Sequence, residues 1–333
     1  DATRSMPRAT RPIGTTPKWS DRRILRILLA MSLVVTGTIG IDSVQTSSGS
    51  AEGVMGGSCT YFAAAASLLG PVRVVAVVGD DWPAEHESAL SSFASIDLAG
   101  LERRSGSSTF RWGGKYHDDM NERDTLFTDL GVLEEAPPPV PAAYTDSRVV
   151  FLANTHPAVQ AGMLEHFPDR DLVVADTMNL WIDIARDELG SLLRRIDGLV
   201  LNDAEACQLT ERSNIVEAAA AICEMGPTFV VIKKGEHGAF LHHPDGQAAL
   251  PAMPLGGSEV VDPTGCGDSF AGGMMGHLAA TGRRDIGTIR EALAWGTVAA
   301  SHTISEFGLA GLQNATGESM RERFDRFRTI TSF

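Results

Sequence analysis

"SEVVDPTGCGDSFAGGMMG" occupies residues 258–276 and is the most informative stretch of the 333-residue chain. Its β-branched residues predict a strand over 258–261, its glycines a tight turn over 262–267, and the run that follows a helix from about Asp268. The N–H groups of such a glycine turn point into one concavity, and the helix N-terminus adds partial positive charge. We therefore expect this turn to bind an anion such as a phosphate group.

Two common nucleotide-binding motifs are absent from the stretch, because it matches neither G-x-x-x-x-G-K-[ST] nor G-x-G-x-x-G. Asp268 directly follows the glycines, where a carboxylate would repel a bound phosphate. The carboxylate becomes useful if a hydroxyl group must lose a proton beside a transferring phosphoryl group. The alternative is that Asp268 only caps the helix, since aspartate is a preferred N-cap residue.

The composition is that of a folded globular protein, with 43% hydrophobic and 21% charged residues. The formal net charge of -14 disfavours nucleic acid or an anionic membrane surface as a partner. The four cysteines form no C-x-x-C pair, which disfavours a zinc site and favours a reducing, cytoplasmic compartment.

The first thirty residues differ from the rest, with seven basic residues against two acidic ones. We interpret residues 1–30 as a basic, unstructured extension and residues 31–333 as the folded domain; a targeting segment is the alternative. No stretch of the chain is long and apolar enough to span a bilayer.

Short apolar runs alternate with helix-like segments along the chain, which predicts an α/β fold with a mostly parallel sheet. The predicted strands are 32–39, 73–79, 148–154, 172–178, 198–203 and 229–235, and the predicted helices are 58–69, 203–210, 214–226, 268–282 and 286–304. Residues 105–130 instead predict an antiparallel hairpin, and a polar segment follows the first strand. We expect these parts, about 42–55 and 105–132, to form a small β lid.

Three motifs in this order resemble those of the ribokinase-like (PfkB) carbohydrate kinase family. They are the glycine pair Gly56-Gly57 before a helix, "NDAE" at 202–205, and "DPTGCGD" at 262–268, with Asp42 matching the aspartate of the first βα loop. The resemblance covers about residues 31–333 and implies a three-layer sandwich with a mostly parallel central sheet and a small β lid. The chain departs from the family pattern at Pro263, at Cys266, and at Tyr61, near which the family often has an asparagine.

The resemblance implies a role for each matched residue near the turn. Asp268 would be the general base, and the backbone N–H groups of Gly265, Cys266 and Gly267 would form the anion hole. The residues implied for the ATP and magnesium side are Asn202, Glu205, Lys233, Gly235, Asp262 and Thr264. Glu205 would act on Mg²⁺ through water, Asp262 and Thr264 would order the turn, and some family members bind a monovalent cation nearby. The alternatives to these roles are that Asn202 only caps the following helix and that Lys233 is only a solvated surface lysine.

On the substrate side, the resemblance implies hydrogen bonds from substrate hydroxyls to Asp42 and close backbone approach at Gly56 and Gly57. The candidates to cover or contact the substrate are Phe110, Arg111, Trp112, Tyr116, Asn121, Arg123, Asp176 and Asn179. The aromatic lid residues are equally explained by packing between the lids of a homodimer.

The resulting prediction is an ATP- and Mg²⁺-dependent kinase that phosphorylates a hydroxyl group, expected to be primary, of a small sugar. Two alternatives stay open: a nucleoside kinase of the same family, and a catalytically silent member that binds a metabolite.

Overall fold

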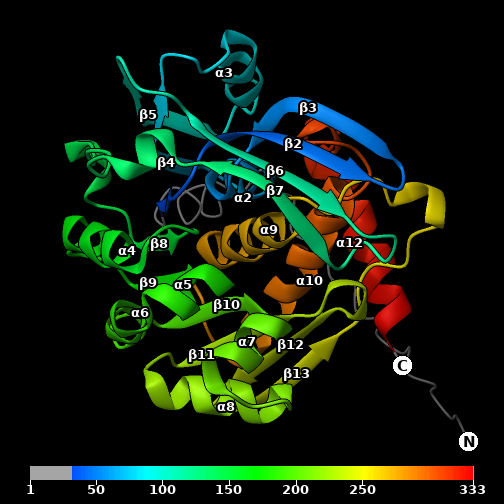
Figure 1. The fold of residues 1–333 in the computed structure, drawn as a ribbon. Helices are drawn as coiled ribbons and strands as arrows, with labels where there is room; N and C mark the ends of the chain where they lie inside the picture. Colours follow the sequence, from blue (N-terminus) through cyan, green and yellow to red (C-terminus); the bar gives the residue numbers. More distant parts are fainter. Residues whose placement is uncertain (1–31, 333) are drawn as a thin grey trace, which may run out of the picture.

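Two β-sheets organise the chain in the computed structural model, which describes residues 32–332 (Figure 1). Within these residues the larger sheet has nine strands in the order β13-β12-β11-β10-β9-β8-β1-β4-β5, and the smaller has four in the order β3-β2-β6-β7. The strands of the larger sheet are β1 (Leu33–Thr36), β4 (Val72–Gly79), β5 (Ile96–Arg104), β8 (Val149–Leu152), β9 (Leu172–Asp176), β10 (Gly198–Asn202), β11 (Phe229–Lys233), β12 (Ala239–His243) and β13 (Gly246–Leu250). Those of the smaller sheet are β2 (Gly40–Thr46), β3 (Gly49–Gly56), β6 (Phe110–Tyr116) and β7 (Arg123–Asp129).

The larger sheet is parallel except at one edge, where β12 and β13 pair antiparallel. Both of its faces are buried, because Leu33 and Val35 of β1 face one hydrophobic cluster while Val34 faces the other. This explains why the predicted strands are apolar throughout rather than alternating.

Helices cover both faces of the larger sheet. Residues of α2, α9, α10 and α12 pack in one cluster, and residues of α4, α6, α7 and α8 pack in the other. The helices are α2 (Ser58–Ser67), α3 (Ala84–Ser91), α4 (Pro157–Met163), α5 (Asn179–Ile184), α6 (Arg186–Leu193), α7 (Asp203–Thr210), α8 (Ile215–Met225), α9 (Cys266–Thr281), α10 (Ile286–Thr303), α11 (Ala310–Gln313) and α12 (Gly317–Thr331). The predicted three-layer α/β class is therefore confirmed.

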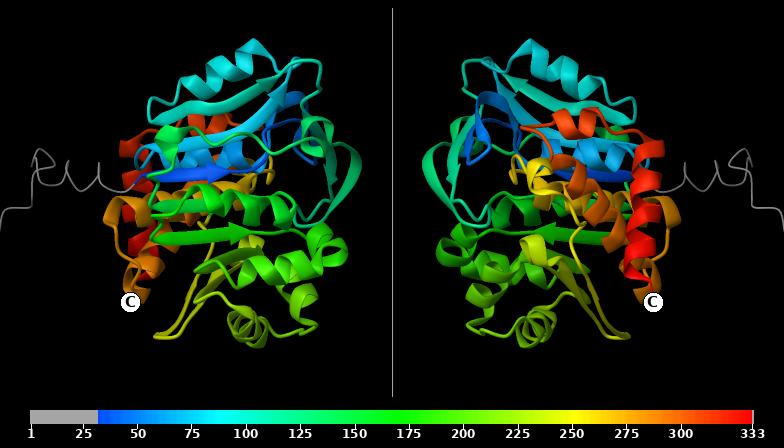
Figure 2. Two further views of the ribbon diagram at one scale, coloured as in Figure 1. Left: turned by 90° about the vertical axis from the view of Figure 1, so that its left-hand side faces the viewer. Right: turned by 90° about the vertical axis from the view of Figure 1, so that its right-hand side faces the viewer.

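The smaller sheet, called here the lid sheet (β2, β3, β6 and β7), is made from two separate chain segments. The hairpins β2–β3 and β6–β7 are antiparallel, and β2 pairs parallel to β6 where they join. In the side views of Figure 2 the lid sheet stands at the end of the larger sheet toward which the parallel strands run. Ligands of open parallel sheets bind at this end.

The structure corrects the prediction around the opening stretch. Residues 258–261 form no strand; Gly257–Glu259 is a short 3-10 helix, and the N–H groups of Val261 and Asp262 both donate to the carbonyl of Ile304 (2.8 and 3.1 Å). The helix that follows begins at Cys266, two residues before the predicted start. The strands β5, β12 and β13 are absent from the prediction.

The basic segment 1–30 lies outside the described residues. Between residues 32 and 332, no helix combines the length and the apolar character needed to cross a bilayer.

Candidate active site

The turn before α9 is held by Asp262 and Tyr61. Asp262 is buried, and its Oδ1 accepts a hydrogen bond from the Thr264 N–H (2.9 Å). Gly265 follows with φ of 74°, and a Cβ at this position would overlap the ring of the fully buried Tyr61. Both the left-handed backbone and the contact with the ring require glycine at position 265.

Two backbone N–H groups of this turn are free to bind an anion. Within the described structure the N–H groups of Gly265 and Gly267 have no protein acceptor, while that of Cys266 donates to the carbonyl of Pro263 (3.2 Å). The family resemblance implies that the Cys266 N–H also belongs to the anion hole. Its hydrogen bond to Pro263 leaves this N–H unavailable to an anion. Lys233 adds charge at the same place, because its Nζ lies 2.8 Å from where a Cβ on Gly267 would be.

Asp268 lies in the first turn of α9 beside these donors, among other buried acids. Burial raises its pKa above the usual value, and the positive charges of Lys233 and Arg123 act in the opposite direction. Burial also raises the pKa of Asp176, at the end of β9, and the charge of Asp268 raises it further. The carboxylates of α9 and β9 thus meet at the carboxyl end of the larger sheet, facing Lys233.

Asp42 brings a further buried carboxyl group from the lid sheet close to Asp262 and Asp268. It lies in lid strand β2 rather than in the predicted βα loop, and it is buried against Gly56, where any Cβ would overlap its carboxylate. Burial raises the pKa of Asp42 to about 7, with further increases from the charges of Asp262 and Asp268, while a backbone hydrogen bond from Gly57 lowers it. Gly57 has φ of 92° and a Cβ there would lie 2.5 Å from the carbonyl oxygen of Thr38, so neither residue of the glycine pair can be replaced without strain.

Asn202 and Glu205 form a reciprocal cap at the start of α7. The side chain of Asn202 accepts from the N–H of Glu205 (2.7 Å), and the side chain of Glu205 accepts from the N–H of Asn202 (2.8 Å). Burial raises the pKa of Glu205, and the charge of Lys233 lowers it. Asn202 therefore caps α7, as the alternative interpretation predicts. One carboxylate oxygen of Glu205 is also used in this cap, because it accepts the hydrogen bond from the Asn202 N–H.

The magnesium ion implied by the family resemblance fits these carboxylates only through waters. The buried Oδ1 of Asp176 has no hydrogen-bond partner in the structure, and it points to a missing ligand. No group of three or more His, Cys, Asp or Glu side chains in residues 32–332 is placed to hold a metal ion by itself. Magnesium ordinarily keeps several of its waters, so Asp176 and Glu205 suit contacts through water.

The lid sheet touches the turn before α9 and the turn after β11. The Thr264 hydroxyl donates to the Tyr116 hydroxyl (3.3 Å), and the side-chain oxygen of Asn121 lies 2.6 Å from where a Cβ on Gly235 would be. Gly235 has φ of 52° and belongs to the turn after β11. The end of the β6–β7 hairpin therefore spans the site from the anion-binding turn to the turn beside Lys233.

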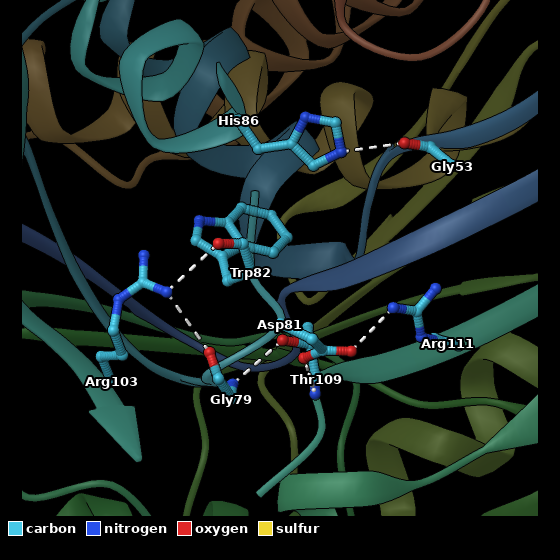
Figure 3. A network of polar contacts seen from close by, with 8 residues as sticks. All are labelled: Gly53, Gly79, Asp81, Trp82, His86, Arg103, Thr109 and Arg111. Atoms are coloured by element: carbon cyan, nitrogen blue, oxygen red, sulfur yellow. Dashed lines mark hydrogen bonds and ion pairs between the residues drawn. The ribbon is translucent and has the colours of Figure 1, made fainter. Parts of the chain in front are cut away.

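Arg111, predicted to contact substrate, is instead part of the attachment of the lid sheet (Figure 3). Its guanidinium is paired with Asp81 Oδ2 (2.7 Å), and Asp81 Oδ1 also accepts from the Thr109 N–H (2.6 Å). His86 of α3 contacts the Gly53 carbonyl of β3 through Nε2 (2.9 Å). The β4–α3 region thus holds both hairpins of the lid sheet.

Asn179 does not join the buried carboxyl groups of the site. It is exposed at the start of α5, and its carbonyl accepts a long hydrogen bond from Gln208 (3.4 Å). The sequence prediction named Asp176 nearby as a candidate, and that residue does face Asp268. The sequence prediction did not identify Tyr61 as the residue that packs against Gly265. The available signal was an aromatic residue five positions after Gly56.

Known kinases match the chain in sequence. The model of the pfkB carbohydrate kinase family matches residues 160–315. The chain is also 30% identical over 250 residues to cytidine kinase of Thermococcus kodakarensis, an alignment covering 74% of this chain and 87% of that protein.

Solved structures show the same fold at lower identity. The nucleoside kinase of Burkholderia thailandensis in complex with inosine is 19% identical and has a TM-score of 0.68, covering 88% of this chain and 98% of that one. Ribokinase from Cryptococcus neoformans var. grubii serotype A in complex with ADP is 20% identical and has a TM-score of 0.70, covering 88% and 99%.

Proposed function

The chain belongs to the pfkB family of carbohydrate kinases and is a phosphotransferase with an alcohol group as acceptor, and we propose that it transfers the γ-phosphoryl group of ATP to a hydroxyl of a nucleoside. The sugar expected first from the sequence is the second candidate. Support for the nucleoside comes from the relative that is 30% identical, a cytidine kinase, and from the solved nucleoside kinase with inosine.

One observation carries the proposed chemistry. Asp268 lies beside the two unpaired N–H groups of Gly265 and Gly267, with Lys233 Nζ next to Gly267. A base, hydrogen-bond donors and a fixed positive charge in one place are what the transfer of a phosphoryl group to an alcohol requires.

In the proposed reaction the substrate hydroxyl loses its proton to Asp268 as its oxygen forms a bond to the γ-phosphorus. The bond from that phosphorus to the β-phosphate oxygen breaks, and ADP leaves with the electron pair. The raised pKa of Asp268 suits this role, because a more basic carboxylate takes a proton from an alcohol more readily. The N–H groups of Gly265 and Gly267 stabilise the charge on the phosphoryl oxygens.

When bound, Mg²⁺ would neutralise part of the charge on the phosphates. Asp176 and Glu205 would hold it through waters. Lys233 lies near the same carboxylates, and its charge opposes the increase in their pKa that burial causes.

The inner face of the lid sheet supports a nucleoside as the acceptor. The ring of Trp112 lies across Gly114 on the same strand, where a Cβ would overlap the indole. An aromatic ring held flat in this way can stack on a nucleobase. Asp42 on the neighbouring strand β2 pairs with Trp112 in the register, which places a hydroxyl acceptor beside the ring.

The test is a coupled assay of ADP release with ATP, Mg²⁺ and a panel of nucleosides and free pentoses. We expect a nucleoside to give the highest kcat/KM. A pentose that exceeds every nucleoside would favour the sugar kinase instead.

Asp268→Asn tests the assigned base in the same assay. Its kcat should fall at least about 100-fold, the usual size of a general-base contribution. ATP affinity, measured by calorimetry, should stay near that of the unmodified protein. Near-normal turnover would exclude Asp268 as the base.

A further inference from the structure

The start of α9 carries the proposed base but forms few hydrogen bonds of its own. Its N-cap residue is Gly265, which has no side chain to accept from the first N–H groups of the helix. The N–H groups of Gly265 and Gly267 also have no acceptor within the described structure, which leaves them free for an anion. A helix end that lacks these hydrogen bonds needs support from another element to stay in one position.

The end of α10 supplies this support. Thr303, the last residue of α10, donates a hydrogen bond from its hydroxyl to the Ser269 hydroxyl (2.7 Å), and both side chains are fully buried. Ser269 directly follows Asp268, and its N–H donates to the Gly265 carbonyl (2.8 Å). The hydroxyl pair thus holds the helical turn that begins at Gly265 and contains Asp268.

Neighbouring residues of α10 contact the same region. The Cys266 thiol donates to the Ala300 carbonyl (3.7 Å). The Ile304 carbonyl, directly after α10, accepts the two N–H groups that precede the anion-binding turn. Residues 300–304 therefore contact both the segment before this turn and the start of α9.

Helix α12 in turn holds the end of α10. Arg323 of α12 donates through Nη1 to the carbonyl (2.7 Å) and to the hydroxyl (3.1 Å) of Ser301. The ring of Trp295 in α10 also stacks on the ring of Phe324 in α12, with 4.2 Å between the ring centroids. The support for the start of α9 is therefore itself fixed by packing against a further helix.

The polar character of the pair favours a role in positioning. A buried hydroxyl costs free energy unless it is hydrogen-bonded, and apolar side chains would fill the same space without that cost. A hydrogen bond, however, fixes the distance and direction between its two atoms more narrowly than an apolar contact does. The residue placed by this bond is the immediate neighbour of Asp268.

We propose that Thr303 is a positioning residue for phosphoryl transfer, which holds Asp268 and the Gly267 N–H in place through the hydroxyl of Ser269. This inference rests on the proposed function, because that function assigns proton transfer to Asp268. Thr303 acts only through Ser269 and takes no part in the bonds that form and break. Misplacement of reacting groups by about 1 Å can cost about 100-fold in rate, so a small shift of the start of α9 has a large effect on turnover.

Kinetics of Thr303→Val test the proposal, because valine keeps the shape of the side chain and removes the hydroxyl. With whichever acceptor in the panel turns over fastest, kcat should fall by at least about tenfold while KM for ATP and for the acceptor changes little. Thr303→Ser restores the hydroxyl and should recover most of the lost turnover. Thr297→Val is the matched control, since this buried threonine of α10 donates to the Leu293 carbonyl of its own helix (3.0 Å), and its kcat should not change.

Ser269→Ala tests the other member of the pair and should lower kcat by a similar factor. Alanine suits a helix, so this variant should fold even if Thr303→Val does not. The double variant Ser269→Ala/Thr303→Val should lose no more than either single variant, because the two hydroxyls act as a pair. Losses that multiply in the double variant would show that the two residues act independently and would overturn the inference.

Amide hydrogen exchange supplies a readout that does not depend on turnover. In the ligand-free protein, exchange over residues 262–270 should be faster in Thr303→Val than in the unmodified protein or in Thr297→Val. Unchanged exchange in this segment, or an unchanged kcat, would overturn the inference. An equal loss of kcat in Thr297→Val would also overturn it, because the effect would then come from general destabilisation of α10. An active Asp268→Asn variant would refute the proposed function, while the exchange measurement would still report whether Thr303 holds the start of α9.

Discussion

Asp42 carries a proton at pH values where a surface aspartate does not. Its pKa rises from the ordinary value of 3.8 to about 7 in the folded protein, mainly because it is buried. The folded protein thus binds this proton more tightly than the unfolded chain does. The contribution of Asp42 to the free energy of unfolding is therefore lost as the pH rises from about 4 to about 7.

Asp42→Asn should raise the melting temperature of the ligand-free protein at pH 8 and leave it unchanged near pH 4. The asparagine stays uncharged at both values, and a tenfold difference in proton affinity corresponds to about 1.4 kcal/mol, so the gain should be a few kcal/mol. Thermal unfolding over a pH series measures this effect. The same variant should lose affinity for the acceptor, because the carboxylate proposed to accept hydrogen bonds from its hydroxyls is gone.

Asp169→Asn is the control for this experiment, because it removes an exposed carboxylate and should leave the melting temperature unchanged at every pH. A wild-type protein more stable than Asp42→Asn at pH 8 would contradict the role given to burial.

At the scale of single elements, the sequence predicts the bounds of a helix or strand best where neighbouring residues determine them. Helix α7 has the predicted bounds, Asp203–Thr210, because Asn202 and Glu205 cap it from within four residues of sequence. The strand predicted over 258–261 fails, since its backbone bonds to the end of α10, some forty residues away. No pattern in the local sequence predicts that contact.

The short strands β12 and β13 escape prediction for a related reason. They form an antiparallel edge whose sequences, AFLHH and GQAAL, show neither a long apolar run nor an alternation of apolar and polar residues. Their place is fixed by pairing with β11 rather than by their own composition.

The attachment of the lid sheet gives a prediction at this scale. Asp81→Ala removes the ion pair with Arg111 and leaves the buried Thr109 N–H without an acceptor, which costs about 1–3 kcal/mol. Amide hydrogen exchange should become faster in β6, and KM for the acceptor should rise while ATP affinity is retained.

Glu87→Ala is the matched control, because it breaks the exposed pair with Arg103 in the same region, a kind of contact worth about 0–1 kcal/mol. Equal exchange rates in β6 of the two variants would show that Asp81 does not hold the lid sheet.

At the scale of the whole molecule, β7 and the residue after it expose three large apolar side chains close together in the sequence, which favours a partner at this surface. Leu126, Phe127 and Leu130 are 50%, 45% and 38% exposed. We predict a homodimer through this surface, and Phe127→Asp should convert it to a monomer in analytical ultracentrifugation.

Ile184→Asp places the same charge on α5, where the isoleucine is 67% exposed, and should leave the dimer intact. A monomeric wild-type protein at micromolar concentration would refute the predicted interface.

The site as a whole was predictable only in part. The glycines, "NDAE" and Asp268 carry their signal in short motifs, whereas the contacts of Asn121 and Arg123 depend on how the lid sheet folds over the larger sheet. Arg111 shows the converse, since this residue next to the aromatic lid positions pairs with Asp81 in the attachment of the lid sheet.

The short connections of the lid sheet have a consequence for protein engineering. Its two segments leave and rejoin the core at four points: between Thr36 and Gly40, between Gly56 and Ser58, between Arg104 and Phe110, and between Asp129 and Gly131. The lid sheet is thus a unit connected to the core at four defined points, whereas Asp268, Lys233 and Glu205 belong to the core. Grafting the two segments from a related enzyme would exchange most of the wall proposed to face the substrate and leave in place the core residues proposed for phosphoryl transfer.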